Sequence, residues 1–179
     1  MRERKNVSIF ASVIQESIKM KLSSIDYAKL ISWLALHRSH VTLGRTQVQK
    51  ILFICYGLYY ARNNSLLFDD DKPQAWPFGP VFPRSYKRYN TYVSAELTDE
   101  EKNEFLKDKG TLFTITMLTD NLCLCTAREL SEWSHQPDSP WSKAVLKDGK
   151  LKWSQELDIE DIKNFFTGEE WKIGLNRVN

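Results

Sequence analysis

The chain has 179 residues, a length typical of one domain with a single core, and it is rich in aromatic side chains: 6 Trp, 7 Tyr and 9 Phe. Its 25 basic and 23 acidic residues give a net charge of +2, so overall charge does not favour nucleic acid or an anionic membrane as a partner. No stretch approaches the ~20 apolar residues of a transmembrane helix, and three cysteines without a secretory leader favour a reducing, cytoplasmic location.

Residues 1–22 are expected to form an amphipathic N-terminal arm. A helical periodicity of three and four residues places its apolar side chains on one face: Val7, Phe10, Ala11, Ile14, Ile18 and Leu22. The simpler interpretation is that this face packs on the chain's own domain, as most amphipathic helices do. The alternative is that Phe10, Ile14 and Ile18, which have the spacing of helix anchors, dock into a groove of a partner.

A second helix is predicted over residues 25–37, with Ser23 or Ser24 as its N-cap. Its buried stripe is expected to consist of Ala28, Ile31, Leu34 and Ala35.

The central element of the predicted fold is a helix over residues 46–62, with Thr46 as the candidate N-cap. From Ile51 to Tyr60 this helix is apolar on nearly every side, so other elements must surround it. Gly57 lies in its middle, where glycine costs about 1 kcal/mol relative to alanine. Glycine at such a position indicates that another backbone approaches closely.

Residues 68–83 are predicted to be a rigid, extended, Pro- and aromatic-rich loop. Each proline fixes φ and removes a hydrogen-bond donor, so the segment is expected to be neither helix nor interior strand. The prolines are Pro73, Pro77, Pro80 and Pro83. The apolar residues between them must be buried against the body or a partner: Trp76, Phe78, Val81 and Phe82. Pro83 suits the first position of a following helix, which carries Arg84, Tyr86, Lys87 and Arg88.

The segment from Gln49 to Tyr86 resembles the signature of the Panacea domain, the SocA-like and GepA-like antitoxin family of bacteria and phages. It contains, in order, Gln-Lys-Ile-Leu, Tyr-Gly, Leu-Phe-Asp, Ala-Trp, Gly-Pro-Val, a proline and a tyrosine. A second block, Glu129 to Trp141, resembles the family's Leu-Ser, Ser-His and Pro-Trp pattern. The resemblance implies an antitoxin that neutralises a cognate toxin by direct contact, and some relatives resemble adaptors that hand the toxin to a protease unfoldase.

Periodicity and resemblance together predict a mainly α, compact helical domain over residues 23–179, built around the central helix. Thr98 and Glu101 form a capping box for one later helix, and Thr126 and Glu129 form a capping box for another. Asp158 and Asp161 open the last helix, which is expected to stop at Gly168, and Asp148 and Gly149 mark a turn before it.

Residues 110–120 carry conflicting signals. Gly110 and the alternation of apolar residues with threonine favour a short strand, whereas the family resemblance implies a longer helix. We predict a helix that ends at Asp120 and Asn121.

The sequence predicts no catalytic residue, metal site or cofactor, and hence a protein that is not an enzyme. His135 follows Ser134, but adjacent helix residues point apart, and Cys55 lies among apolar positions where a thiol is unreactive. Cys123 and Cys125 lack the second pair of ligands that a zinc site needs.

The best interface candidate is the aromatic loop with the helix after it, because Trp, Tyr and Arg dominate binding hot spots. The candidate contact residues there are Trp76, Phe78, Arg84 and Tyr86. Arg84, Lys87 and Arg88 also keep a second function open, that of a nucleic-acid-binding regulator of a phage or toxin-antitoxin operon, although three charges on a helix more often form a solvated face.

Overall fold

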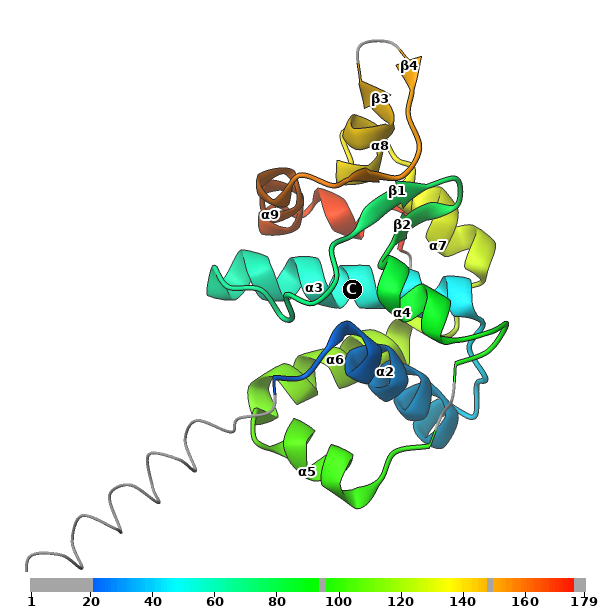
Figure 1. Ribbon diagram of the computed structural model, residues 1–179, viewed down its shortest axis with the longest axis vertical. Helices are drawn as coiled ribbons and strands as arrows, with labels where there is room; N and C mark the ends of the chain where they lie inside the picture. The colour runs from blue at the N-terminus through cyan, green and yellow to red at the C-terminus, as the bar shows by residue number, and fades with distance from the viewer. Residues whose placement is uncertain (1–20, 94–95, 148–149, 176–179) are drawn as a thin grey trace, which may run out of the picture.

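The fold is arranged around α3, Arg45–Asn63, which crosses the middle of the molecule (Figure 1). The computed structural model describes residues 21–93, 96–147 and 150–175. Every residue of α3 from Val48 to Leu58 is buried, which confirms the prediction of a central helix that other elements surround. The predicted N-cap, Thr46, is wrong by two positions: the cap is Gly44, whose backbone N–H donates to Gln47 Oε1 at 3.0 Å, and Thr46 lies in the first turn.

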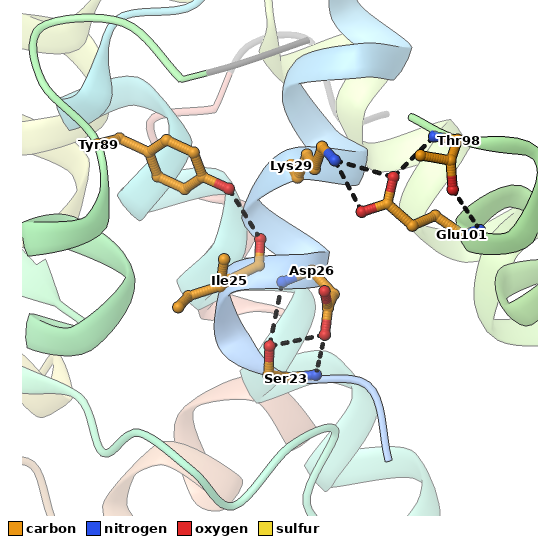
Figure 2. A network of polar contacts seen from close by, with 7 residues as sticks. All are labelled: Ser23, Ile25, Asp26, Lys29, Tyr89, Thr98 and Glu101. Carbon is orange, nitrogen blue, oxygen red and sulfur yellow. Dashed lines mark hydrogen bonds and ion pairs between the residues drawn. The ribbon is translucent and has the colours of Figure 1, made fainter. Parts of the chain in front are cut away.

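Helix α2, Ser24–Ser39, packs beside α3 and buries the predicted stripe of Ala28, Ile31, Leu34 and Ala35. Figure 2 shows its capping box, in which the Asp26 backbone N–H donates to Ser23 Oγ and the Ser23 N–H donates to Asp26 Oδ2 at 2.7 Å. The predicted N-cap is therefore confirmed at Ser23.

Helix α5, Asp99–Leu106, is joined to α2 by one carboxylate. Glu101 accepts the Thr98 backbone N–H at 2.7 Å, which closes the predicted capping box, and it also accepts Lys29 Nζ of α2 at 2.7 and 2.8 Å (Figure 2). The Lys29 ammonium is the main reason that the pKa of Glu101 lies below its usual value. In the same view, the Tyr89 hydroxyl donates to the Ile25 carbonyl at 3.4 Å.

Helix α6, Lys109–Leu122, confirms the predicted helix over residues 110–120. The predicted end at Asp120 and Asn121 is wrong, because both side chains are bonded without disrupting the backbone. Asp120 pairs with Arg38 at 2.7 Å, and Asn121 Nδ2 donates to the Met117 carbonyl at 2.8 Å.

The remaining helices follow the predicted caps. Helix α7, Ala127–Ser134, has the Thr126 and Glu129 capping box, and α9, Ile159–Thr167, begins after Asp158 and ends at Gly168. The short helices are α4, Pro83–Arg88, which begins at the predicted proline, α8, Pro140–Val145, and the 3-10 turn η1, Glu170–Lys172.

The segment predicted to be a loop without strands contains a β-hairpin, which corrects that prediction. β1, Gln74–Trp76, pairs antiparallel with β2, Gly79–Val81, and on its other side with β5, Gln155–Glu156. Pro80 is tolerated because β2 is an edge strand, where a missing donor leaves no ladder bond unmade. A separate two-stranded ribbon pairs β3, Leu146–Lys147, with β4, Lys150–Leu151. The predicted turn at 148–149 lies outside the described residues.

One buried core runs from Tyr27 to Leu175. The predicted arm lies almost entirely outside the described residues, and so do its candidate contacts Phe10, Ile14 and Ile18. Of the arm, Lys21 pairs with Asp69 and Leu22 packs against the core. The boundary predicted between residues 22 and 23 stays a prediction.

Gly57 is needed because of a ring and not, as predicted, because of a second backbone. A Cβ at this position would lie 2.1 Å from Cδ2 and Cε2 of Phe166 on α9. Phe166 is 3% exposed and is held between other rings, including Phe53 at 5.6 Å and Trp171 at 5.9 Å, so it has no space to retreat.

We expect Gly57→Ala to lower the free energy of unfolding by about 1–2 kcal/mol, because overpacking outweighs the gain in helix propensity. The control is Gly110→Ala in α6, where the nearest atom to the new Cβ is 3.7 Å away and propensity alone acts. Urea unfolding measures both variants. A Gly57→Ala protein as stable as the control would contradict close packing of α9 on α3.

Candidate functional site

Two adjacent side chains of α3 hold the β1–β2 hairpin against this helix through hydrogen bonds. Gln49 accepts the Phe82 backbone N–H at 2.8 Å and donates to Ser85 Oγ at 2.9 Å. Lys50 Nζ donates to the Pro80 carbonyl at 2.9 Å. Both side chains are buried, so their polar groups have hydrogen bonds to β2 and the start of α4 in place of hydrogen bonds to water. The position of the hairpin on α3 is therefore specified by hydrogen bonds as well as by apolar packing.

Lys50 is the functional-site residue that sequence reasoning missed. Its side chain is 0% exposed, and burial lowers the pKa of the ammonium to about 7. The signal was a lysine at the start of the apolar run of the central helix, where a charge without a solvated face must find an internal acceptor.

Gly79 lets the hairpin lie directly on this lysine. A Cβ at Gly79 would be 2.5 Å from Lys50 Cε and 2.2 Å from Ser134 Oγ of α7, and its φ of +102° is one that side chains rarely adopt. The glycine of the Gly-Pro-Val motif thus allows α3, α7 and the hairpin to meet at one point.

A buried carboxylate joins the same segment to α2. Asp71 accepts the Ser85 backbone N–H at 2.9 Å and Ser24 Oγ at 3.2 Å. Burial raises the pKa of Asp71, and hydrogen bonds from Ser85, Arg84 and Ser24 act in the opposite direction. The neighbouring Asp70 accepts the Ser24 N–H at 2.9 Å and pairs with Arg84 at 3.4 Å.

The structure places the predicted contact residues of the aromatic segment in different environments. Trp76 is partly buried, with its ring 5.0 Å from Tyr86, and its carbonyl accepts Trp141 Nε1 at 2.8 Å. The Arg45 guanidinium lies over the Tyr86 ring at 3.7 Å. Trp76 and Tyr86 therefore help to pack the hairpin against α4 and α8. Arg84 forms a surface ion pair that joins α4 to Asp70. Phe78, at the turn, is 71% exposed.

A pocket of about 450 Å³ lies beside Phe78. It is lined by Phe78, Thr46, Ala127, Arg128, Ser131, Glu132 and His135. The His135 ring stacks on Trp141 at 3.8 Å, and its buried Nε2 finds no hydrogen-bond partner among the residues described. Burial, followed by the nearby Lys50, lowers the pKa of His135. The pocket is thus walled by an exposed ring and a neutral imidazole, features that suit a partner's side chain.

Burial raises the pKa of the Cys55 thiol to about 12, so it is not a nucleophile at neutral pH. Within residues 21–93, 96–147 and 150–175, no group of three or more His, Cys, Asp or Glu residues is placed to hold a metal ion. None of the described helices has the length and apolar character needed to cross a bilayer.

Comparison with known proteins gives one family. The family model described as "Antitoxin SocA-like, Panacea domain" matches residues 48–142, a range that contains most of α3, the β1–β2 hairpin and α4 through α7. No curated protein and no solved structure matches the chain.

Lys50 makes a testable contribution to stability. Its folded pKa of about 7 lies below its ordinary value of 10.5, so the unfolded state binds more protons between these values, and stability rises as the pH is raised through this window. We expect the free energy of unfolding to rise by up to ~1.4 kcal/mol per pH unit between about pH 7 and 8, below the ordinary pKa values of cysteine (about 8.5) and tyrosine (about 10). Lys50→Met should remove this rise.

The matched control is Lys87→Met, which removes an exposed lysine from α4 and should keep the pH dependence of the wild type. Urea unfolding at a series of pH values gives the slopes. A slope in Lys50→Met equal to that of the wild type would show that Lys50 stays charged in the fold.

Proposed function

The chain belongs to the SocA-like antitoxins with a Panacea domain, and we propose that it neutralises a cognate protein toxin by binding it directly. The observation that carries the proposal is Phe78, a phenylalanine that is 71% exposed on a hairpin whose other parts are held firmly in place. Exposed aromatic residues beside a pocket are typical of protein interfaces.

The hairpin is preorganised for binding. Its backbone is bonded to Gln49, Lys50 and Trp141, so little conformational freedom is left to lose when Phe78 meets a partner. The pocket beside Phe78 offers a place for a side chain of the toxin, with Ser131 and Glu132 at its polar side. The tip of the hairpin and this pocket together form the contact surface that we propose.

We further propose that the protein acts without catalysis, in the cytoplasm of a bacterium or in association with a phage. The buried, unreactive Cys55 and the buried Cys123 agree with a reducing compartment and a structural role for the thiols. A role as an adaptor that hands the toxin to a protease unfoldase is a variant of this proposal, and its only support is resemblance to relatives.

The alternative function, nucleic-acid binding through α4, is disfavoured by two contacts. Arg84 pairs with Asp70, and the Tyr86 ring is packed between Arg45 and Trp76, so neither presents the free charge or the open ring face of a stacking platform. We therefore expect no specific binding of duplex DNA or single-stranded RNA at physiological salt in a gel titration. Submicromolar, sequence-selective binding that weakens steeply with salt would reverse this ranking.

The proposed contact at the hairpin tip is tested with Phe78→Asp. The candidate toxin is the product of the neighbouring gene, co-expressed with this protein. We expect rescue of growth to be lost and the dissociation constant to rise by about thirtyfold, the effect of losing a hot spot of about 2 kcal/mol. The matched control is Phe113→Asp on α6, where the ring is 67% exposed. Circular dichroism establishes that both variants fold. Equal rescue by both variants would remove the hairpin tip from the interface.

The arm is the second predicted contact. We expect Phe10→Asp combined with Ile14→Asp to leave the domain folded and to weaken rescue, because anchors at this spacing dock amphipathic helices into grooves. Deletion of residues 1–20 keeps Leu22, which packs on the core, and gives the same readout. Full rescue by the deleted protein would remove the arm from the toxin interface.

A further inference from the structure

Helix α6 presents large apolar side chains on its outer side. Phe113 and Met117 are four residues apart, so they are neighbours on one face of this helix. Phe113 is 67% exposed and Met117 is 46% exposed. Leu106, at the end of the adjacent α5, is 49% exposed. A group of exposed apolar side chains of this size is typical of a surface that another element covers.

A pocket lies on each side of this face. The first, of about 310 Å³, has Cys55, Leu67, Thr111 and Thr114 among its lining residues. The second, of about 330 Å³, has Trp33, Leu106, Leu112 and Thr116 among its lining residues. The helical periodicity of α6 places Phe113 and Met117 between the residues that line the two pockets. The face is therefore a ridge between two grooves, which is the shape on which a second helix packs.

The described chain begins beside this face. Lys21 pairs with Asp69, two positions after Leu67, which lines the first pocket. Leu22 packs against the core. Helix α2, which follows, packs along α6, and its blue starting end lies close to α6 in Figure 1. The arm of residues 1–20 is thus attached at the edge of the apolar face.

The arm does not continue the axis of α2. Ser23, the N-cap, has extended backbone geometry with φ −95° and ψ 169°, so a helix in the arm would be separate from α2 and free to take its own direction. A segment attached this close meets the face at an effective concentration on the order of millimolar. Any separate molecule must compete with that concentration, so the arm is the favoured occupant.

The apolar side of the arm matches the face in length. As a helix, the stretch from Phe10 to Ile18 spans ~12 Å, and the stretch of α6 from Thr111 to Met117 spans ~9 Å. Ile18 is three positions before Lys21, so it lies within ~10 Å of that residue in any conformation. The anchors of the arm can therefore reach the first pocket and the ridge beside it.

We propose that, in the free protein, the arm of residues 1–20 docks as a helix on its own domain and covers the face of Phe113 and Met117 with Phe10, Ile14 and Ile18. This inference concerns the free protein and goes beyond the proposed function. It implies that a toxin which binds the same anchors must first displace the arm from α6. The docked arm would then be an autoinhibited contact.

The direct test places a nitroxide on the full-length chain. Gln15→Cys puts the label beside the anchors and off the apolar side of the arm, and the native thiols of Cys55, Cys123 and Cys125 are buried and should stay unlabelled. We expect the label to broaden the methyl resonance of Met117. Adding Phe113→Asp should remove the broadening.

The matched control for Phe113→Asp is Leu151→Asp on β4, where the leucine is 65% exposed, and it should leave the broadening unchanged. Circular dichroism establishes that each variant folds. A mixed sample, in which one chain carries the nitroxide and another carries the observed methyl, tests for contact between two copies.

A second measurement needs no label. Oxidation of Met117 by peroxide, followed by mass spectrometry, reports the access of solvent to its sulfur. We expect Met117 to be oxidised at least about threefold faster in Ile14→Asp than in the wild type, because the arm then leaves α6. The matched control is Gln15→Asp, which adds the same charge off the apolar side of the arm and should keep the wild-type rate.

The outcomes distinguish the possible occupants of the face. Broadening within one chain that Phe113→Asp removes, together with slow oxidation in the wild type, would support the inference. Absence of broadening, with equal oxidation in the wild type and Ile14→Asp, would overturn it. Broadening in the mixed sample alone would overturn it in favour of a second copy. Protection of Met117 only after the product of the neighbouring gene is added would overturn it in favour of the toxin. The result for the free protein does not depend on the proposed function.

Discussion

The hydrogen bond from Lys50 to the Pro80 carbonyl is the constraint on which the exposed surface depends. Helix α3 has no solvated side along its buried stretch, so each polar side chain it carries there must find a partner inside the protein. Lys50 and Gln49 find theirs in the backbone from Pro80 to Phe82. The hairpin is consequently tied to the most deeply buried element of the fold, and the ring at its tip is directed outward.

This arrangement needs glycine at two close approaches. At Gly57 the ring of Phe166 lies where a Cβ would be, so α9 reaches α3 at short range. At Gly79 the backbone lies against Lys50 and Ser134 with a positive φ, and any side chain would separate the hairpin from α3 and α7. The two glycines therefore allow different contacts. Gly57 allows α9 to pack closely on α3, and Gly79 allows the hairpin to lie against the buried Lys50 side chain.

Local signals in the sequence were enough to predict the helices and most of their caps, because a capping box such as that of Thr98 and Glu101 involves residues only three apart. The strands were missed because they are two or three residues long, and β1 is completed by β5, about eighty positions away. The prolines correctly predicted that this segment contains no interior strand, but they do not exclude an edge strand, and Pro80 lies in one. The exposure of Phe78 and the burial of Lys50 could not be predicted from the sequence, because both depend on how the hairpin and α7 pack on α3.

Phe78 stands on a hairpin that α3 holds through the hydrogen bond from Lys50, and both elements lie within the range that the family model matches. In the proposed function this exposed ring would offer a partner an apolar, preorganised contact, because the backbone beneath it has little conformational freedom left to lose on binding.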